Sequence, residues 1–275
     1  LAIEKLNQLK TLEPSNTAID KKLAEIYYLK NDFSKAADAY SRFAMGPTAN
    51  EEDLVKYAFA LFLNHDFAKS LEVANMGLKK NPRHAAFNRL AMYNNTDLKR
   101  FEEALKAADV FFNECDKADY SYLDYMYYGH LLEELKKYDE AVGQYEKAVE
   151  LDPTKTDLYK NISSVYEQKN DYKKAIGAYH KYYSSLEKEK QTPDLQFQLG
   201  RLYYGAGTQP DSLTINVEER KQALMSADSV FQVISEAAPD SYLGNFWRAR
   251  ANSALDPETT QGLAKPFYEE VAALL

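Results

Sequence analysis

The sequence predicts an all-α protein in which pairs of helices recur along the chain. An aromatic residue returns at Phe33, Phe67, Phe101, Tyr138 and Tyr172, which are 34, 34, 37 and 34 residues apart. Each of these residues opens a stretch with apolar side chains at helical spacing, and another such stretch precedes it. Only 10 Gly and 9 Pro occur in 275 residues, which leaves few turns for a many-stranded sheet. A fixed period of this length indicates an array of helix pairs.

The composition narrows the class of protein. The chain is 45% hydrophobic and 28% charged, and no apolar run approaches the 18 residues of a membrane span, so none is predicted. Its net charge is −8 and it has no basic block, which argues against a nucleic-acid partner. A single cysteine, Cys115, excludes an internal disulfide.

The clearest repeat begins at Tyr122 and resembles the tetratricopeptide repeat, a helix–turn–helix unit of 34 residues. The resemblance implies a right-handed superhelix, or α-solenoid, of tandem repeats. Small residues at positions 8, 20 and 27 let the two helices approach closely, aromatic residues at 11, 17 and 24 fill the space between them, and Pro at 32 ends the second helix. The residues at positions 4, 7, 8, 11, 17, 20, 24, 27 and 32 are Tyr125, Tyr128, Gly129, Leu132, Tyr138, Ala141, Tyr145, Ala148 and Pro153.

Aligning the whole chain to this 34-residue pattern predicts a single superhelical domain over residues 1–275. The unit from Ala85 is weaker than the others, because Asn95 stands at position 11 where an aromatic residue is usual. The predicted repeats cover residues 17–50, 51–84, 85–121, 122–155, 156–192, 193–241 and 242–275.

Residues 1–16 fit the second helix of a repeat, since Ala2, Leu6 and Leu9 take positions 20, 24 and 27 and Pro14 takes position 32. We therefore expect the chain to begin inside a longer superhelix, and to be cut at its other end as well. The alternative is a lone capping helix.

The repeat over 193–241 carries an insertion at about 208–222. We predict a loop from Thr208 to Asn216 and a helix from about Val217, with Asn216 as N-cap and acidic residues in the first turn. The loop is interpreted either as a tolerated surface insertion or as a contact for a partner.

No catalytic constellation is present, so we expect neither an enzyme nor a metal or cofactor site. The four histidines lack the spacing of a metal site, and no phosphate-binding glycine loop or nucleophile elbow occurs. A structural role is expected for Cys115. Of Arg248 and Arg250, one is expected to pair with a Glu and the other to be solvated.

The resemblance implies instead a non-catalytic scaffold that binds a peptide or protein segment in a concave groove. In the family this groove is lined by the first helix of each repeat, with positions 2, 5, 9, 12 and 13 pointing into it. The alternative is a regulatory, sensor or assembly module of a longer protein whose catalytic or membrane part lies outside this chain. Phe59, Phe62 and Leu63 are equally consistent with packing between repeats. A clamp for chaperone tails is not expected, because Lys21 is followed by Glu25 rather than Asn. The predicted groove residues are Tyr28, Val55, Phe59, Phe62, Arg89, Tyr93, Met126, His130, Phe197, Arg201 and Tyr204.

The segment "LDPETTQGLAKPFYEEV" also resembles tetratricopeptide proteins of Bacteroidetes bacteria. That resemblance favours the bacterial periplasm or cell envelope, with the cytoplasm as the alternative. Self-association through the ends of the superhelix is a further alternative.

Overall fold

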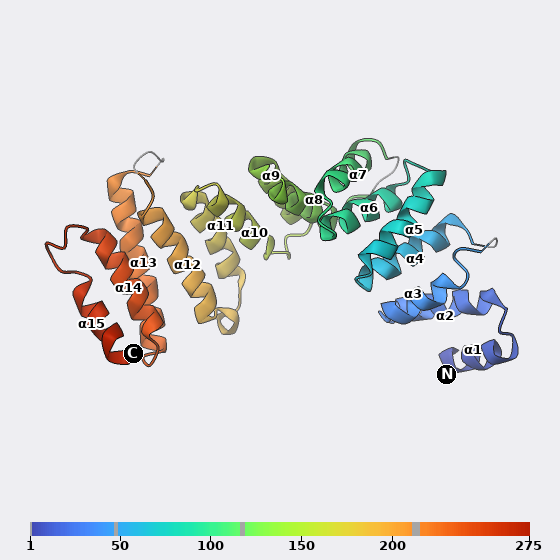
Figure 1. Ribbon diagram of the computed structural model, residues 1–275, viewed down its shortest axis with the longest axis horizontal. Coiled ribbons are helices and arrows are strands. Elements are labelled where there is room, and N and C mark those ends of the chain that lie inside the picture. Colours follow the sequence, from blue (N-terminus) through green and yellow to red (C-terminus); the bar gives the residue numbers. More distant parts are fainter. Residues whose placement is uncertain (1, 47–48, 116–118, 211–214) are drawn as a thin grey trace. The chain divides into compact units, whose positions relative to one another are not determined.

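The computed structural model describes residues 2–46, 49–115, 119–210 and 215–275, and every regular element in these ranges is a helix (Figure 1). The predicted all-α fold is confirmed. Across the same ranges, no helix combines the length and the apolar character needed to cross a membrane.

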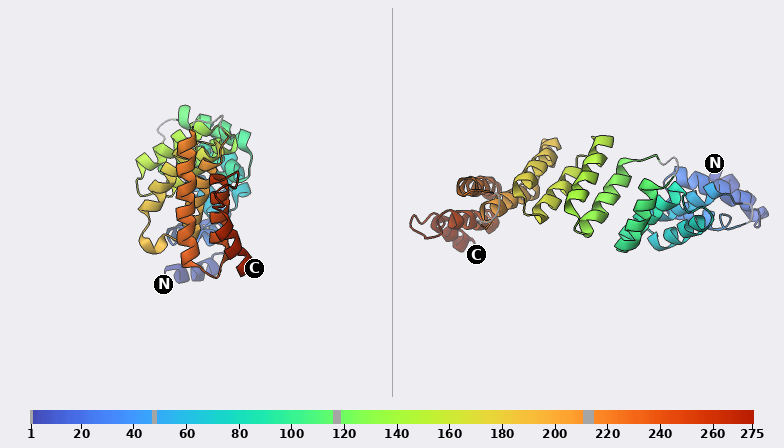
Figure 2. Two further views of the ribbon diagram at one scale, coloured as in Figure 1. Left: turned by 90° about the vertical axis from the view of Figure 1, so that its left-hand side faces the viewer. Right: turned by 90° about the horizontal axis from the view of Figure 1, so that it is seen from above.

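The chain divides into two compact units, Leu1–Lys137 and Tyr138–Leu275, and within each unit neighbouring helices pack side by side (Figures 1 and 2). The boundary falls between the two helices of the repeat predicted over 122–155, and the single domain over 1–275 stays a prediction. The first unit comprises α1 (Ala2–Leu12), α2 (Thr17–Leu29), α3 (Phe33–Ser41), α4 (Glu51–Leu63), α5 (Phe67–Lys80), α6 (Ala85–Asp97), α7 (Phe101–Asn113) and α8 (Tyr122–Glu134). The second comprises α9 (Tyr138–Leu151), α10 (Leu158–Gln168), α11 (Tyr172–Ser185), a 3₁₀ turn (Lys188–Lys190), α12 (Pro193–Gly207), α13 (Val217–Ala237), α14 (Tyr242–Leu255) and α15 (Lys265–Leu274).

The turns inside the helix pairs share one backbone conformation. A non-glycine residue with positive φ stands two residues before each periodic aromatic, as Asn31 does before Phe33 with φ of 59°. The residue between the positive-φ residue and the aromatic is the N-cap of the second helix. In the first of these turns it is Asp32, whose carboxylate accepts a hydrogen bond from the backbone N–H of Lys35 at 3.3 Å. A left-handed residue costs about 1 kcal/mol, so the close packing of the two helices must offset this cost at each turn. Besides Asn31, the positive-φ residues of these turns are His65, Lys99, Lys136 and Asn170.

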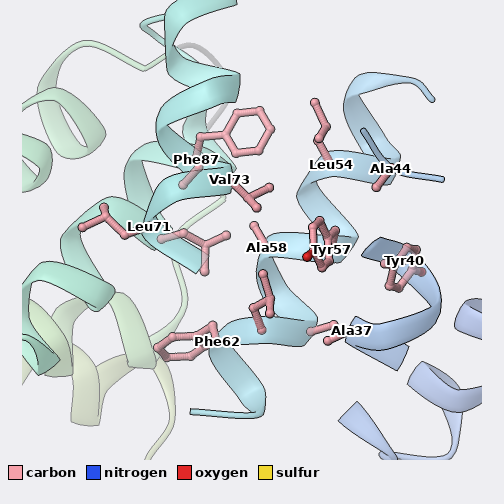
Figure 3. Close-up of a cluster of buried hydrophobic side chains, with 14 of the residues drawn as sticks. Ala37, Tyr40, Ala44, Leu54, Tyr57, Ala58, Phe62, Leu71, Val73 and Phe87 are labelled. Carbon is pink, nitrogen blue, oxygen red and sulfur yellow. The ribbon is translucent and has the colours of Figure 1, made fainter. Parts of the chain in front are cut away.

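The core of the first unit alternates small and aromatic side chains, as the repeat pattern predicts. Ala58 is completely buried, and Tyr40, Tyr57 and Phe62 lie around it in the close-up of Figure 3. The helices approach so closely that a Cβ atom at Gly77 would collide with the buried ring of Phe87. Glycine is therefore required at this helix crossing for steric reasons.

The second unit contains the predicted insertion. Helix α13 begins at Val217, and Asn216 and Glu219 form a capping box, which confirms the predicted start. Residues 211–214 of the predicted loop lie outside the described residues. Gln209, however, is buried; its Nε2 donates to the carbonyl of Asn170 at 2.8 Å, and Arg220 donates to the carbonyl of Gln209 at 2.9 Å. The start of this segment therefore packs on the helices, contrary to the expectation of a surface loop throughout.

The paired arginines of α14 also differ from expectation. Arg248 pairs with Asp228 at 3.0 Å rather than with a Glu. Arg250 is not simply solvated, because its guanidinium lies over the ring of Trp247 at 4.7 Å from the centroid. Cation–π contact holds this side chain against the helix surface.

Candidate partner-binding surface

Three aromatic side chains form a continuous ladder across the first unit. Phe62 of α4, Tyr93 of α6 and Tyr127 of α8 come from the first helices of three consecutive pairs. The Tyr93 and Tyr127 rings stack with centroids 4.1 Å apart, and Phe62 lies 5.5 Å from Tyr93 and 6.1 Å from Tyr127. We call these three residues the aromatic ladder. Such contacts fix the register of neighbouring repeats.

An ion pair between Arg89 and Asp124 fixes the position of Tyr93 in the ladder. Asp124 has no exposed surface, and Arg89 donates to its two oxygens from Nε at 2.7 Å and from Nη2 at 3.1 Å. The Tyr93 hydroxyl donates to the same carboxylate at 2.6 Å, and Ser121 adds its backbone N–H at 2.7 Å and its hydroxyl at 2.9 Å. Burial, followed by the negative charge of Asp124, raises the pKa of Tyr93 far above its usual value. Tyr93 therefore stays protonated as a donor at any physiological pH.

Asp97, the last residue of α6, lies beside the outer end of the ladder. It accepts a hydrogen bond from the Tyr127 hydroxyl at 3.0 Å. Partial burial raises the pKa of Asp97, while the Tyr127 hydrogen bond and then the positive potential of His130 and His65 lower it. Within the described part of the chain, no lysine or arginine forms an ion pair with this carboxylate. Asp97 is thus an exposed carboxylate that accepts a hydrogen bond from Tyr127 and that no lysine or arginine of the described ranges pairs with.

The structure places the predicted groove residues of the first unit in three different environments. Phe62 and Tyr93 are buried, with exposed fractions of 8% and 1%, because they pack between repeats in the ladder. For Phe62 the packing alternative therefore describes its position, and Tyr93 is likewise buried between repeats, whereas its role in a groove stays a prediction. His130 is exposed. The half-buried remainder is Tyr28, Val55, Phe59, Arg89 and Met126.

The other predicted groove residues lie in the second unit, where two of the three belong to an aromatic group around Trp247. Phe197 meets Trp247 edge-on with ring centroids 5.5 Å apart, and Tyr204 does so at 5.4 Å. Arg201 is exposed and lies 3.8 Å from Glu167. The structure therefore divides the predicted set into a group in each unit.

Sequence reasoning missed two residues of this surface. Asp97 stands at position 13 of the repeat from Ala85, which is one of the predicted groove positions, so the frame itself could have identified it. Tyr127 stands at position 6, which lies outside the predicted groove positions. Only the packing of α8 against α6 reveals its stacking on Tyr93.

Among the described residues, no cluster of three or more His, Cys, Asp or Glu side chains could hold a metal ion. Cys115 is half-buried, and its sulfur accepts a hydrogen bond from the Asn88 amide at 3.5 Å.

Comparisons with known proteins agree with the geometry. The tetratricopeptide repeat model matches residues 123–155. Among solved structures, the chain is similar to the C-terminal part of a TPR repeat-containing protein from Cytophaga hutchinsonii, a bacterium of the Bacteroidetes. The two are 30% identical with a TM-score of 0.60, and the match covers 80% of this chain and 78% of that one.

More distant structures share the fold alone. MamA from Desulfovibrio magneticus RS-1 is 18% identical with a TM-score of 0.55, covering 64% of this chain and 97% of that one. Another MamA crystal structure is 20% identical with a TM-score of 0.53, covering 63% and 93%. No curated protein matches the sequence. The 34-residue period, the all-helical fold and the relative from Cytophaga together show that the chain belongs to the tetratricopeptide repeat family.

Proposed function

We propose that this protein is a non-catalytic scaffold whose first unit binds an extended protein segment along the aromatic ladder, with a basic side chain of that segment placed on Asp97. The observation that carries the proposal is the unneutralised carboxylate of Asp97 beside Tyr127. A lysine or arginine at this point would pair with the carboxylate while its alkyl stem lies on Tyr127, the half-buried member of the ladder.

The rest of the surface supports this orientation. Phe59, Val55 and Met126 are half-buried apolar residues on the same first helices, and they offer contacts for the remainder of the segment. The ladder is held rigid by the Arg89–Asp124 pair, so little side-chain entropy is lost when a partner binds. The net charge of −8 favours association with basic segments.

The test compares two matched peptides in fluorescence polarisation, one with the sequence Gly-Leu-Lys-Leu-Gly-Leu and one with Glu in place of Lys. The lysine peptide should bind more tightly. Asp97→Asn should weaken its binding about fivefold, as expected when an exposed ion pair worth roughly 1 kcal/mol is lost. Glu102→Gln, which removes an exposed carboxylate of α7, serves as the control and should leave binding unchanged. Equal binding of both peptides, or equal effects of both variants, would refute the proposal.

A further inference from the structure

A pocket of about 530 Å³ opens in the first unit between α5, α6 and α7. Leu71, Asn75 and Leu78 of α5 line one wall, and Ala107 and Val110 of α7 line the other. Asn88, Ala91 and Asn95 of α6 also line the pocket. We call this hollow the Asn pocket.

The pocket lies where this repeat departs from its neighbours. Asn95 occupies position 11, at which Leu61 and Leu132 are buried in the two adjacent repeats. A leucine or tyrosine at this position fills the space between helices, whereas the shorter asparagine leaves it open. The replacement of the usual aromatic or large apolar residue by Asn95 at position 11 thus coincides with the pocket.

Asn95 is a polar residue of the pocket wall whose side chain has no partner among the described residues. Its exposed fraction is 6%, and its side chain makes no hydrogen bond to any residue that the structure describes. Among the described residues, the buried polar atoms that lack a hydrogen-bond partner do not include the carboxamide atoms of Asn95, so this group keeps contact with solvent in the pocket and can exchange that water for a ligand. Asn88 is also buried, but its Nδ2 already donates to the carbonyls of Pro82 and His84 at 2.9 and 3.1 Å.

The Asn pocket lies on a different side of α6 from the ladder. Asn88, Ala91 and Asn95 are spaced at three and four residues and share one face of the helix. Arg89 and Tyr93 lie about 100° or more away from this face at 100° per residue, and they contact Asp124 instead. Occupation of the pocket would therefore leave Asp97 and the ladder side of α6 unobstructed.

The lining defines the chemistry of the ligand. A carboxamide donates and accepts at once, which matches a peptide bond, and the leucine and valine walls suit an apolar side chain. An adjacent hollow of about 870 Å³ shares Leu71, Asn75, Leu78 and Arg100 with the pocket, so the two form an elongated depression along α5. Arg100 and Lys106 at the rim are accompanied by Glu103, and such a mixed rim lacks the basic excess that nucleic acid requires.

We propose that the Asn pocket is a second, independent protein-binding site, which takes an extended peptide with one apolar side chain between Leu71 and Val110 and a backbone amide bonded to Asn95. It differs from the ladder surface in position and in ligand charge, because it requires no basic residue.

The experiment selects a phage-displayed library of random heptapeptides against the protein, with counter-selection against Asn95→Leu. Selected peptides are then synthesised and titrated by calorimetry. We expect sequences with a central apolar residue. Asn95→Leu fills the pocket and should reduce their affinity at least tenfold while raising the Tm, and Asn95→Ala should also reduce affinity without filling the space.

Two controls separate this site from the proposed ladder site. Asp97→Asn should leave these peptides' affinity unchanged, and Asn113→Leu, on an exposed part of α7, should behave as the unaltered protein. In nitrogen-15 spectra the side-chain amide resonances of Asn75 and Asn95 should shift on binding. The inference would be overturned by the absence of any enriched sequence, by peptides that bind both Asn95 variants as well as the unaltered protein, or by a Tm that falls in Asn95→Leu while binding persists.

Discussion

Replacing Arg89 with Met should destabilise the first unit strongly, because it leaves the carboxylate of Asp124 buried without its cation. Asp124 is fully buried and accepts two bonds from Arg89, at 2.7 and 3.1 Å. Removal of one partner of a buried ion pair costs about 3–5 kcal/mol. The Arg89 side chain keeps 22% of its surface exposed, and Tyr93 and Ser121 still donate to the carboxylate, so we expect the lower end, about 3 kcal/mol.

Urea denaturation followed by circular dichroism at 222 nm measures this loss. The double variant Arg89→Met/Asp124→Asn removes both charges, keeps a side-chain oxygen that can accept from Tyr93 and Ser121, and should recover much of the stability. Lys106→Met, on the exposed side of α7, is the matched control and should change the free energy of unfolding by less than about 0.5 kcal/mol. A loss below about 1 kcal/mol for Arg89→Met, or a double variant no more stable than the single one, would show that the ion pair does not hold α6 to α8.

The remaining predictions concern three other positions. Gly77→Ala should lower stability by about 1–2 kcal/mol in the same denaturation assay, because overpacking against Phe87 exceeds the gain in helix propensity; an unchanged midpoint would contradict the close helix crossing. Burial raises the pKa of Asp97, so the folded state binds this proton more readily than the unfolded state does. Asp97→Asn should therefore have a higher Tm than the unaltered protein at pH 7, and thermal melts should show the difference vanishing as pH falls through the raised pKa; a difference that grows on acidification would refute the sign. Gln209→Ala should cost about 1–2 kcal/mol by loss of its buried bond to Asn170, whereas an unchanged Tm would restore the interpretation of this segment as a free surface loop.

Much of the fold could be read from the sequence because each repeat carries its own local signals. The aromatic at position 17 begins the second helix at Phe33, Phe67, Phe101, Tyr138 and Tyr172, and the structure begins a helix at each of them. Even the irregular start of α13 at Val217 follows from a local capping box. Helix ends depend on residues within a few positions, so spacing alone identifies them.

The candidate site was less predictable because it depends on contacts between repeats. Position numbers place Phe62 and Tyr93 toward the groove, but they cannot show that Tyr127 from the next repeat stacks on them and buries them. Likewise, Arg89 was expected to be available to a partner, whereas Asp124, 35 residues away, binds its guanidinium.

The sequence by itself determined that this chain is an array of paired helices of the tetratricopeptide type. The signals for this are local and occur in every repeat: the 34-residue period, the small residues at the helix crossings and the turn residues. Each repeat therefore predicts the same helix pair independently. Only the tertiary structure decided which side chains remain free. Whether a carboxylate such as Asp97 has a partner, or an asparagine such as Asn95 fills its space, depends on side chains of other helices, brought close by packing that a repeat pattern does not encode.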